Sequence, residues 1–376
     1  MRTLFKIFIL LILSVLTIYF MYSQEIINFS SLRQSFYDNK KIIVFIAFIQ
    51  ILNILFLTLR YFSLLKIFQI HAAFKNVLAS NYVSLAIGQW FPGALAVIEV
   101  LRIALMLGSH NKAANINESN KIIDGIEQAL TDLSLKSKLA AVSLMDRLIG
   151  FIVMLFIGCI TILFLYFKSV YQNPGNLNNL LLFLLFNFSL FVLMLTLPFL
   201  AKSKFFRKII TRIETLCIVT FRKGILNKIF RKFFNELNSL FDVLTLGIKK
   251  VTLFWVPLIL SFVSFMLMGL GLYLSGVAIS ASIPFSAILS VISILSLASL
   301  LPIGLGGMGG MQIVAILVFS IFNVSPQHAS SAQLLQTAIS LIAITFMGLL
   351  FAKFSSAQIC KVLSLQKNKE ILTRKI

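Results

Sequence analysis

The chain has 376 residues, of which 59% are hydrophobic and only 12% are charged, and its mean hydropathy is +0.98. It has too few polar side chains to cover a soluble globular domain, so the composition excludes a soluble enzyme or binding module and predicts a membrane protein. A net charge of +21 could indicate nucleic-acid binding. The basic residues lie in connecting segments and in the tail, however, so we expect contact with anionic lipid headgroups and no nucleic acid.

Cysteine and histidine are rare and scattered, with three of each in the chain. The cysteines show neither a CxxC motif nor zinc-ligand spacing, so no disulfide framework is predicted. No metal site and no cofactor are expected.

Two apolar runs open the chain, at 7–22 and 42–59, and each is near the ~20 residues that a helix needs to cross a bilayer. The first follows Arg2 and Lys6 but has no small-residue cleavage site after it, so it is predicted to be an uncleaved span rather than a signal peptide. The N-terminus is then cytoplasmic and the loop between the two runs is external.

The segment 201–250 fixes the orientation, because it holds twelve Lys or Arg and should be cytoplasmic. Spans at 139–167 and 179–200 then cross outward and back, which leaves the polar segment 108–138 inside as a loop. The stretch 77–107 therefore begins and ends inside. Because Pro92 and Gly93 interrupt it, it is predicted to be a re-entrant hairpin.

The second half contains four further apolar runs, at 251–275, 284–301, 310–323 and 330–352. If all four cross, the basic tail 353–376 returns to the cytoplasm. The predicted fold is all-α: a single integral membrane domain over 1–376, with about eight crossings, one re-entrant hairpin and both termini cytoplasmic. Cysteine labelling at Ser109 and Ser280 should find them on opposite sides.

Apolar residues recur at helical spacing within 201–250, with basic residues between them. The pattern predicts two amphipathic helices lying on the inner leaflet. They could equally be a connector that packs on the bundle between its two halves.

Two pairs of charges stand inside apolar segments. Glu99 and Arg102 share one helix face, and Asp146 and Arg147 lie about 10 to 12 Å into the next helix at 1.5 Å per residue. Both pairs should lie at a similar depth, so the four charges could meet. Charges at that depth are costly and therefore functional candidates, but a neutral quartet that only locks the hairpin to its neighbour is the alternative.

The segment LPIGLGGMGGMQ at 301–312 is the second Pro/Gly interruption of an apolar run. Broken helices in both halves of a chain point to a transporter binding site, where backbone N–H groups can approach an anion. Glycines in membrane helices also mark close helix packing. The candidate substrate-contacting positions here are Gly306, Gly307, Gly309 and Gln312, with Pro302 as the helix break.

These residues together resemble a known family. A Pro-Gly turn followed by Glu99 and Arg102, then Asp146-Arg147, then P-x-x-x-G-G-x-G from Pro302 is similar to the lysylphosphatidylglycerol synthase transmembrane family, also called flippase-like, over about 40–352. The resemblance implies a lipid-translocating domain in the bacterial cytoplasmic membrane that handles anionic or aminoacylated phospholipids. Full-length synthases carry a soluble aminoacyl-transferase domain; since this chain ends at Ile376, it is expected to lack that domain.

The chain departs from the family pattern at three places. Val97-Ile98-Glu99 replaces a Gly-Gly-Asp, Met311-Gln312 replaces an Arg-Glu, and Gln336 stands where a basic residue is common. Either the substrate differs or the activity is reduced.

Three functions remain open at this point. The first is a flippase or transporter of anionic phospholipids or polyprenyl-phosphate lipids, with Arg102 and Arg147 contacting the headgroup. The second is an intramembrane headgroup transferase with Glu99 or Asp146 as acid or base. The third is a non-catalytic partner of a glycosyltransferase or lipid-modifying enzyme. We expect that the protein is not an enzyme, so the intramembrane transferase is the less favoured of the three.

Overall fold

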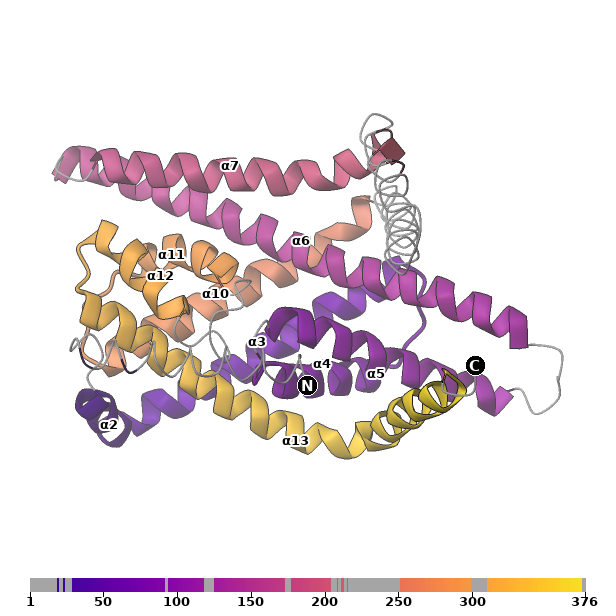
Figure 1. Ribbon diagram of the computed structural model, residues 1–376. Helices are drawn as coiled ribbons and strands as arrows, with labels where there is room; N and C mark the ends of the chain where they lie inside the picture. The colour runs from indigo at the N-terminus through magenta and orange to yellow at the C-terminus, as the bar shows by residue number, and fades with distance from the viewer. Residues whose placement is uncertain are drawn as a thin grey trace.

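The computed structural model describes residues 29–91, 94–117, 125–172, 177–203, 251–298 and 310–373, with a few isolated positions elsewhere. These ranges form helices joined by short turns (Figure 1). The long helices are α3 (Lys40–Ile67), α6 (Gly125–Gln172), α7 (Leu177–Lys202), α10 (Trp255–Ala278) and α13 (Pro326–Thr373). The shorter ones are α2 (Phe29–Asp38), α4 (Phe74–Gly88), α5 (Ala94–Asn117), α11 (Phe285–Ala298) and α12 (Gly310–Phe319), with 3-10 turns at Val251–Phe254 and Ser320–Phe322.

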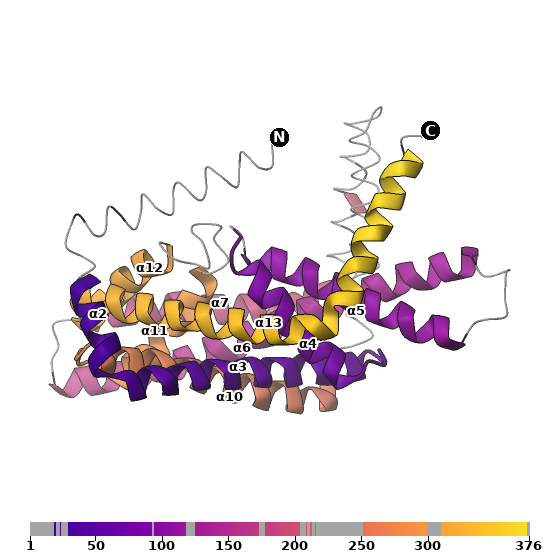
Figure 2. The ribbon, with the colours of Figure 1, turned by 90° about the horizontal axis from the view of Figure 1, so that it is seen from below.

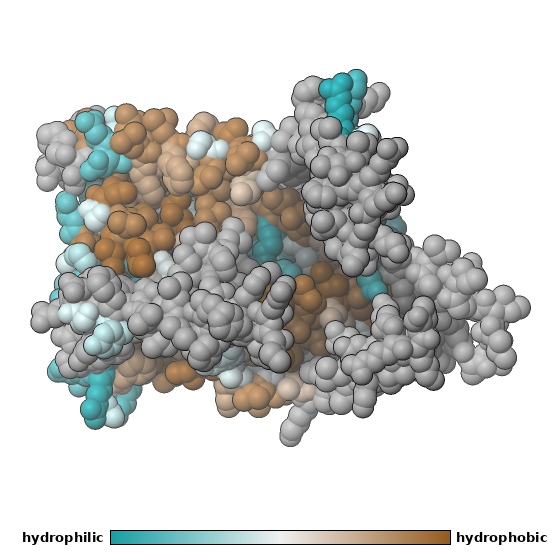
Figure 3. Space-filling model, in the orientation of Figure 1, coloured by the Kyte–Doolittle hydropathy of each residue, from teal (hydrophilic) through white to brown (hydrophobic). Residues whose placement is uncertain are grey.

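The five long helices are each long and apolar enough to cross a membrane. α7 is the most peripheral, because only 17% of its apolar window is buried within the protein. Its exposed side chains, such as Leu182 and Phe186, are large and apolar. Much of the surface in Figure 3 is likewise apolar. A surface of this kind needs lipid as its solvent, so the polytopic helical membrane fold predicted from composition is confirmed.

α3 and α10 run antiparallel along the centre of the bundle and are joined by polar contacts. Asn39 at the start of α3 donates to the carbonyl of Ala278 at the end of α10 (2.8 Å). Ser264 Oγ donates to Asn53 Oδ1 (2.5 Å) near the middle. Inside a bilayer, polar groups must find their partners in the protein, and these contacts also fix the register of the two helices.

α4 and α5 form the predicted interruption between α3 and α6. They pack against each other, and the break between them falls after Gly88, at the place predicted for the hairpin tip. α4 also packs along α13, where the rings of Tyr82 and Phe351 stack with centroids 5.2 Å apart. Pro92 and Gly93 themselves lie outside the described residues.

α11 and α12 differ from their prediction as two crossings. They have 14 and 10 residues, or about 21 and 15 Å at 1.5 Å per residue, short of the ~30 Å hydrocarbon core. Phe285 at the start of α11 packs on Tyr273 near the end of α10, whereas Leu295 and Met311 meet in one cavity half-way along the bundle. The described part of each helix therefore reaches only half-way in.

The end of this second broken segment returns to the side from which it entered. Phe322, just after α12, packs on Phe183 near the start of α7, with centroids 6.1 Å apart. α11 and α12 thus make a half-depth pair that enters from the end of α10, opposite to the end from which α4 enters. A hydropathy pattern shows that such runs are apolar but cannot distinguish two half-spans from two crossings.

The polar segment 108–138, predicted as a loop, is largely helical. α5 continues to Asn117 and α6 begins at Gly125, so both helices extend beyond their apolar parts. Figure 2 shows these ends projecting from one end of the bundle. The tail is similar, because α13 continues to Thr373. The start of α6 and the tail contain many Leu, Lys, Gln, Glu and Ala residues, which are good helix formers and keep a helix going after the apolar pattern has ended. The first span at 7–22 and nearly all of 201–250 lie outside the described residues.

The antiparallel pairing of α3 and α10 gives a test of the topology. In a cysteine-free background, Ser280→Cys should react with a membrane-impermeant maleimide in intact cells, whereas Lys66→Cys should react only after permeabilisation. Both side chains are exposed, and they lie at opposite ends of the α3–α10 pair. Labelling of both from one side would contradict this orientation.

Candidate functional site

Five charged side chains from three helices meet inside the bundle: Arg60 of α3, Glu99 and Arg102 of α5, and Asp146 and Arg147 of α6. We refer to these five as the charge cluster. Arg60 lies seven residues, about 10 Å, before the end of α3. The cluster is therefore well inside the apolar length of the bundle.

Asp146 forms the centre of the cluster. Its Oδ1 accepts a hydrogen bond from Arg60 Nε at 2.6 Å, and its Oδ2 lies 3.5 Å from Arg102 Nη1. Arg60 also donates through Nη1 to Ser261 Oγ on α10 (3.1 Å). A side chain at Gly150 would place its Cβ 2.9 Å from Arg60 Nη1, so the glycine leaves the space that the guanidinium occupies.

Glu99 joins the other two arginines. It accepts from Arg102 Nη2 through Oε2, and from Arg147 Nε through Oε1 at 2.7 Å. The guanidinium of Arg102 also lies over the ring of Tyr61, with Cζ 3.9 Å from the ring centroid. A desolvated cation in this position gains from the negative face of the ring, which helps to offset the cost of burying it.

Exposure rises from one end of the cluster to the other. The side chains of Arg60, Arg102 and Asp146 are 3 to 4% exposed. Glu99 is 19% exposed and Arg147 30%. Arg147 is therefore the most exposed member of the cluster, followed by Glu99. Figure 3 shows a hydrophilic spot within a recess of the apolar face, beside the place where α6 crosses the bundle in Figure 1.

The structure brings together all four charges singled out from the sequence and adds a fifth, Arg60. The span predicted at 42–59 ends just before Arg60, but α3 continues to Ile67 and Arg60 is 3% exposed. The apolar residues that follow it, such as Leu64 and Leu65, were the signal that the helix goes on. Among the described residues the cluster therefore holds three cations and two anions, so it is not the neutral set of four charges, although the pairing of Glu99 and Asp146 with Arg102 and Arg147 is present.

The second predicted site segment is only partly described. Pro302, Gly306, Gly307 and Gly309 lie outside the described residues, and only Gln312 can be placed. It is on the first turn of α12 and is 1% exposed.

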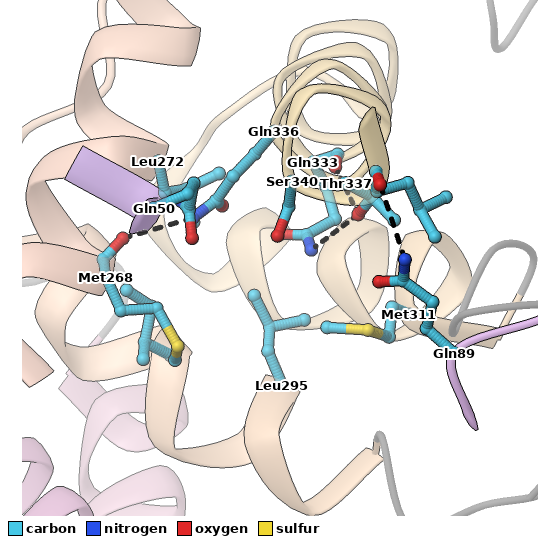
Figure 4. Close-up of a pocket in the computed structure, with 12 residues that line it drawn as sticks. Gln50, Gln89, Met268, Leu272, Leu295, Met311, Gln333, Gln336, Thr337 and Ser340 are labelled. Carbon is cyan, nitrogen blue, oxygen red and sulfur yellow. Dashed lines mark hydrogen bonds between the residues drawn. The ribbon is translucent and has the colours of Figure 1, made fainter. Parts of the chain in front are cut away.

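A separate cavity of about 170 Å³ lies where the two broken segments converge. We call it the glutamine cavity (Figure 4). Gln89 after α4 and Met311 at the start of α12 both line it, and the remaining polar lining residues are Gln50, Gln333, Gln336, Thr337 and Ser340. Gln50 and Arg60 are ten residues apart on α3, about 15 Å along the axis. Sequence reasoning missed this site, because its glutamines come from three distant segments.

Most of the cavity's amides are held by neighbours. Gln89 Nε2 donates to Thr345 Oγ1 (2.9 Å), and Gln336 Nε2 donates to the carbonyl of Met268 (3.2 Å). Two polar atoms of the cavity lack such a neighbour. Gln50 Nε2 and Gln333 Oε1 are buried with no hydrogen-bond partner among the described residues. Met311 and Gln336, two of the positions at which the sequence departs from the family it resembles, both line this cavity.

Comparison with known proteins adds one decisive finding. The sequence model of the lysylphosphatidylglycerol synthase TM region matches residues 5–348. The chain belongs to this family. The membrane-embedded, lipid-related character inferred from the sequence is thus confirmed. The comparisons with curated proteins and with solved structures give no match.

The burial gradient of the charge cluster predicts unequal effects on stability. Arg60→Met should cost about 3 to 5 kcal/mol, because it leaves the buried carboxylate of Asp146 without its closest partner. Arg147→Gln should cost about 1 kcal/mol or less, because Arg147 is part-exposed and its partner Glu99 keeps Arg102. Thermal unfolding in detergent, with Arg33→Gln at an exposed position as the matched control, measures both. Equal losses for Arg60 and Arg147 would contradict the gradient.

Proposed function

We propose that this protein binds anionic lipids and moves them between the leaflets of the membrane, with the charge cluster as the site for the headgroup phosphate. The observation that carries the proposal is the surplus positive charge of a buried cluster whose accessible member is an arginine. Family membership supports a lipid-related role.

The surplus charge favours an anion for energetic reasons. An uncompensated charge inside a membrane costs several kcal/mol, whereas paired charges cost much less. The cluster holds three arginines and two carboxylates, so one positive charge is left over among the five. A phosphate reaching Arg147 would neutralise it through a charge-assisted hydrogen bond, for which a guanidinium fork is well suited.

Polar contacts continue from the cluster towards the centre of the bundle. Arg60 bonds to Ser261, Asn53 to Ser264, and the carbonyl of Met268 to Gln336 at the glutamine cavity. These contacts lie along the α3–α10 pair. They make a polar interior next to the cluster, which a charged headgroup needs if it is to cross the hydrocarbon at low cost.

We propose transport rather than catalysis. An acid or base needs a free lone pair or proton within reach of the reacting group. Asp146 is 2% exposed and bound by Arg60 and Arg102. Glu99 is bound by two arginines as well. These carboxylates are therefore suited to positioning arginines, and an intramembrane transferase is the weaker proposal.

We place this activity in a bacterial cytoplasmic membrane, with the charge cluster nearer the cytoplasmic face. The support is the family resemblance together with the excess of basic residues in the segments assigned to the inside. A protein partner docking on 201–250 would be compatible with this arrangement.

Proteoliposomes test the proposal. The protein should accelerate the movement of fluorescent phosphatidylglycerol between leaflets, followed by dithionite quenching. Arg147→Gln should slow that movement about 10- to 100-fold, because a hydrogen bond to a charged group is worth about 1.5 to 3 kcal/mol. The fold should survive this change.

Two controls make the result specific. Lys66→Gln removes an exposed cation near the same end of the bundle and should leave the rate unchanged. Phosphatidylcholine, which has no net charge, should move slowly both with the unmodified protein and with Arg147→Gln. If no anionic lipid moves, transport is wrong; if Arg147→Gln transports normally, the phosphate role of the cluster is wrong.

A further inference from the structure

We infer that the glutamine cavity is a second binding site, for the uncharged, hydroxyl-rich part of a lipid headgroup such as a glycerol or a sugar. This inference rests on the proposed function, because it names the kind of lipid that the protein handles. It assigns the phosphate to the charge cluster and the polyol to the cavity.

The chemistry of the cavity matches hydroxyl groups. Its buried unpartnered atoms are a donor, Gln50 Nε2, and an acceptor, Gln333 Oε1. A hydroxyl group can accept from the first and donate to the second. An ionised phosphate offers only acceptors and an ammonium group only donors, so each would satisfy one of these atoms and leave the other unpaired.

The absence of charge on the described lining residues also favours a neutral ligand with hydroxyl groups. None of the described residues that line the cavity carries a charge, and its polar members are amides and hydroxyls. An ion placed there would have no counter-charge at the centre of the bundle, where desolvation is most costly. Neutral hydroxyls pay a much smaller penalty and recover it through hydrogen bonds.

The two unpartnered glutamines are held in place for this role. Gln50 and Gln333 are 5% and 4% exposed. Gln333 Nε2 donates to Thr337 Oγ1 one turn further along α13 (3.4 Å). This hydrogen bond orients the amide, so that its oxygen is left without a partner among the described residues. Gly271 of α10 leaves room for Gln50, because a Cβ there would lie 2.7 Å from Gln50 Nε2.

Size and position also fit a headgroup. At about 30 Å³ per water, the cavity of about 170 Å³ equals roughly six waters, which is comparable to a glycerol or a single sugar ring. It lies about 15 Å along α3 from Arg60. Both broken segments end at it, through Gln89 on one side and Leu295 and Met311 on the other, so it occupies the point half-way across the bundle.

Two matched lipid pairs test the inference in nanodiscs, with bound lipid counted by native mass spectrometry. Phosphatidylglycerol against phosphatidylpropanol, both phosphodiesters with one negative charge, differs only by two hydroxyl groups, and monoglucosyl-diacylglycerol against diacylglycerol differs only by the sugar. The protein should prefer the hydroxyl-bearing member of at least one pair about tenfold or more. The pair that is discriminated tells whether the polyol is glycerol or a sugar.

Gln333→Met should abolish that preference, whereas Gln327→Met, the same change at an exposed position of α13, should keep it. Arg147→Gln should weaken both phospholipids equally and leave the preference unchanged. A protein that discriminates neither pair, or that still discriminates after Gln333→Met, has a cavity that holds water only, and the inference is overturned. The glucosyl pair carries no phosphate, so its outcome does not depend on the charge cluster.

Discussion

The placement of Asp146 between two arginines holds four helices of the bundle together. One carboxylate joins α3, through Arg60, to α5, through Arg102, and Arg60 in turn reaches α10 through Ser261. Four helices or helix segments are thereby fixed relative to one another at a depth where water cannot replace a lost partner. Because removing one ion of a buried pair leaves the other uncompensated, these helices must stay in register.

The remaining charges of the cluster depend on that arrangement. Arg102 is held by Glu99 and lies against Tyr61, which leaves Arg147 and Glu99 at the accessible edge. The buried core of the cluster thus positions the part that can meet a ligand. The third arginine gives the cluster one more cation than anion among the described residues, and an unbalanced charge inside a membrane is costly unless it is paired.

The two broken segments have separate roles in this picture. The α4–α5 segment contributes Glu99 and Arg102 to the cluster and Gln89 to the glutamine cavity, so it connects the two sites. The described ends of the α11–α12 segment reach only the cavity. Because the two segments enter from opposite ends, a polar region lies at the centre of the bundle. Irregular backbone at that depth must be buried in protein or line a cavity, and this arrangement meets that requirement.

The sequence by itself determined the class and the family, because the balance of apolar and charged residues excludes a soluble fold and because Glu99, Arg102, Asp146 and Arg147 stand out in apolar helices. It also located the interruption between α4 and α5. Three things were decided only by tertiary structure. Arg60 lies inside α3 and joins the cluster, the described ends of α11 and α12 meet half-way across the bundle, and four glutamines surround one cavity: Gln50, Gln89, Gln333 and Gln336. The physical reason is common to all three. Hydropathy and spacing act along one helix, whereas charge balance, depth and cavity lining arise from the packing of helices far apart in the chain.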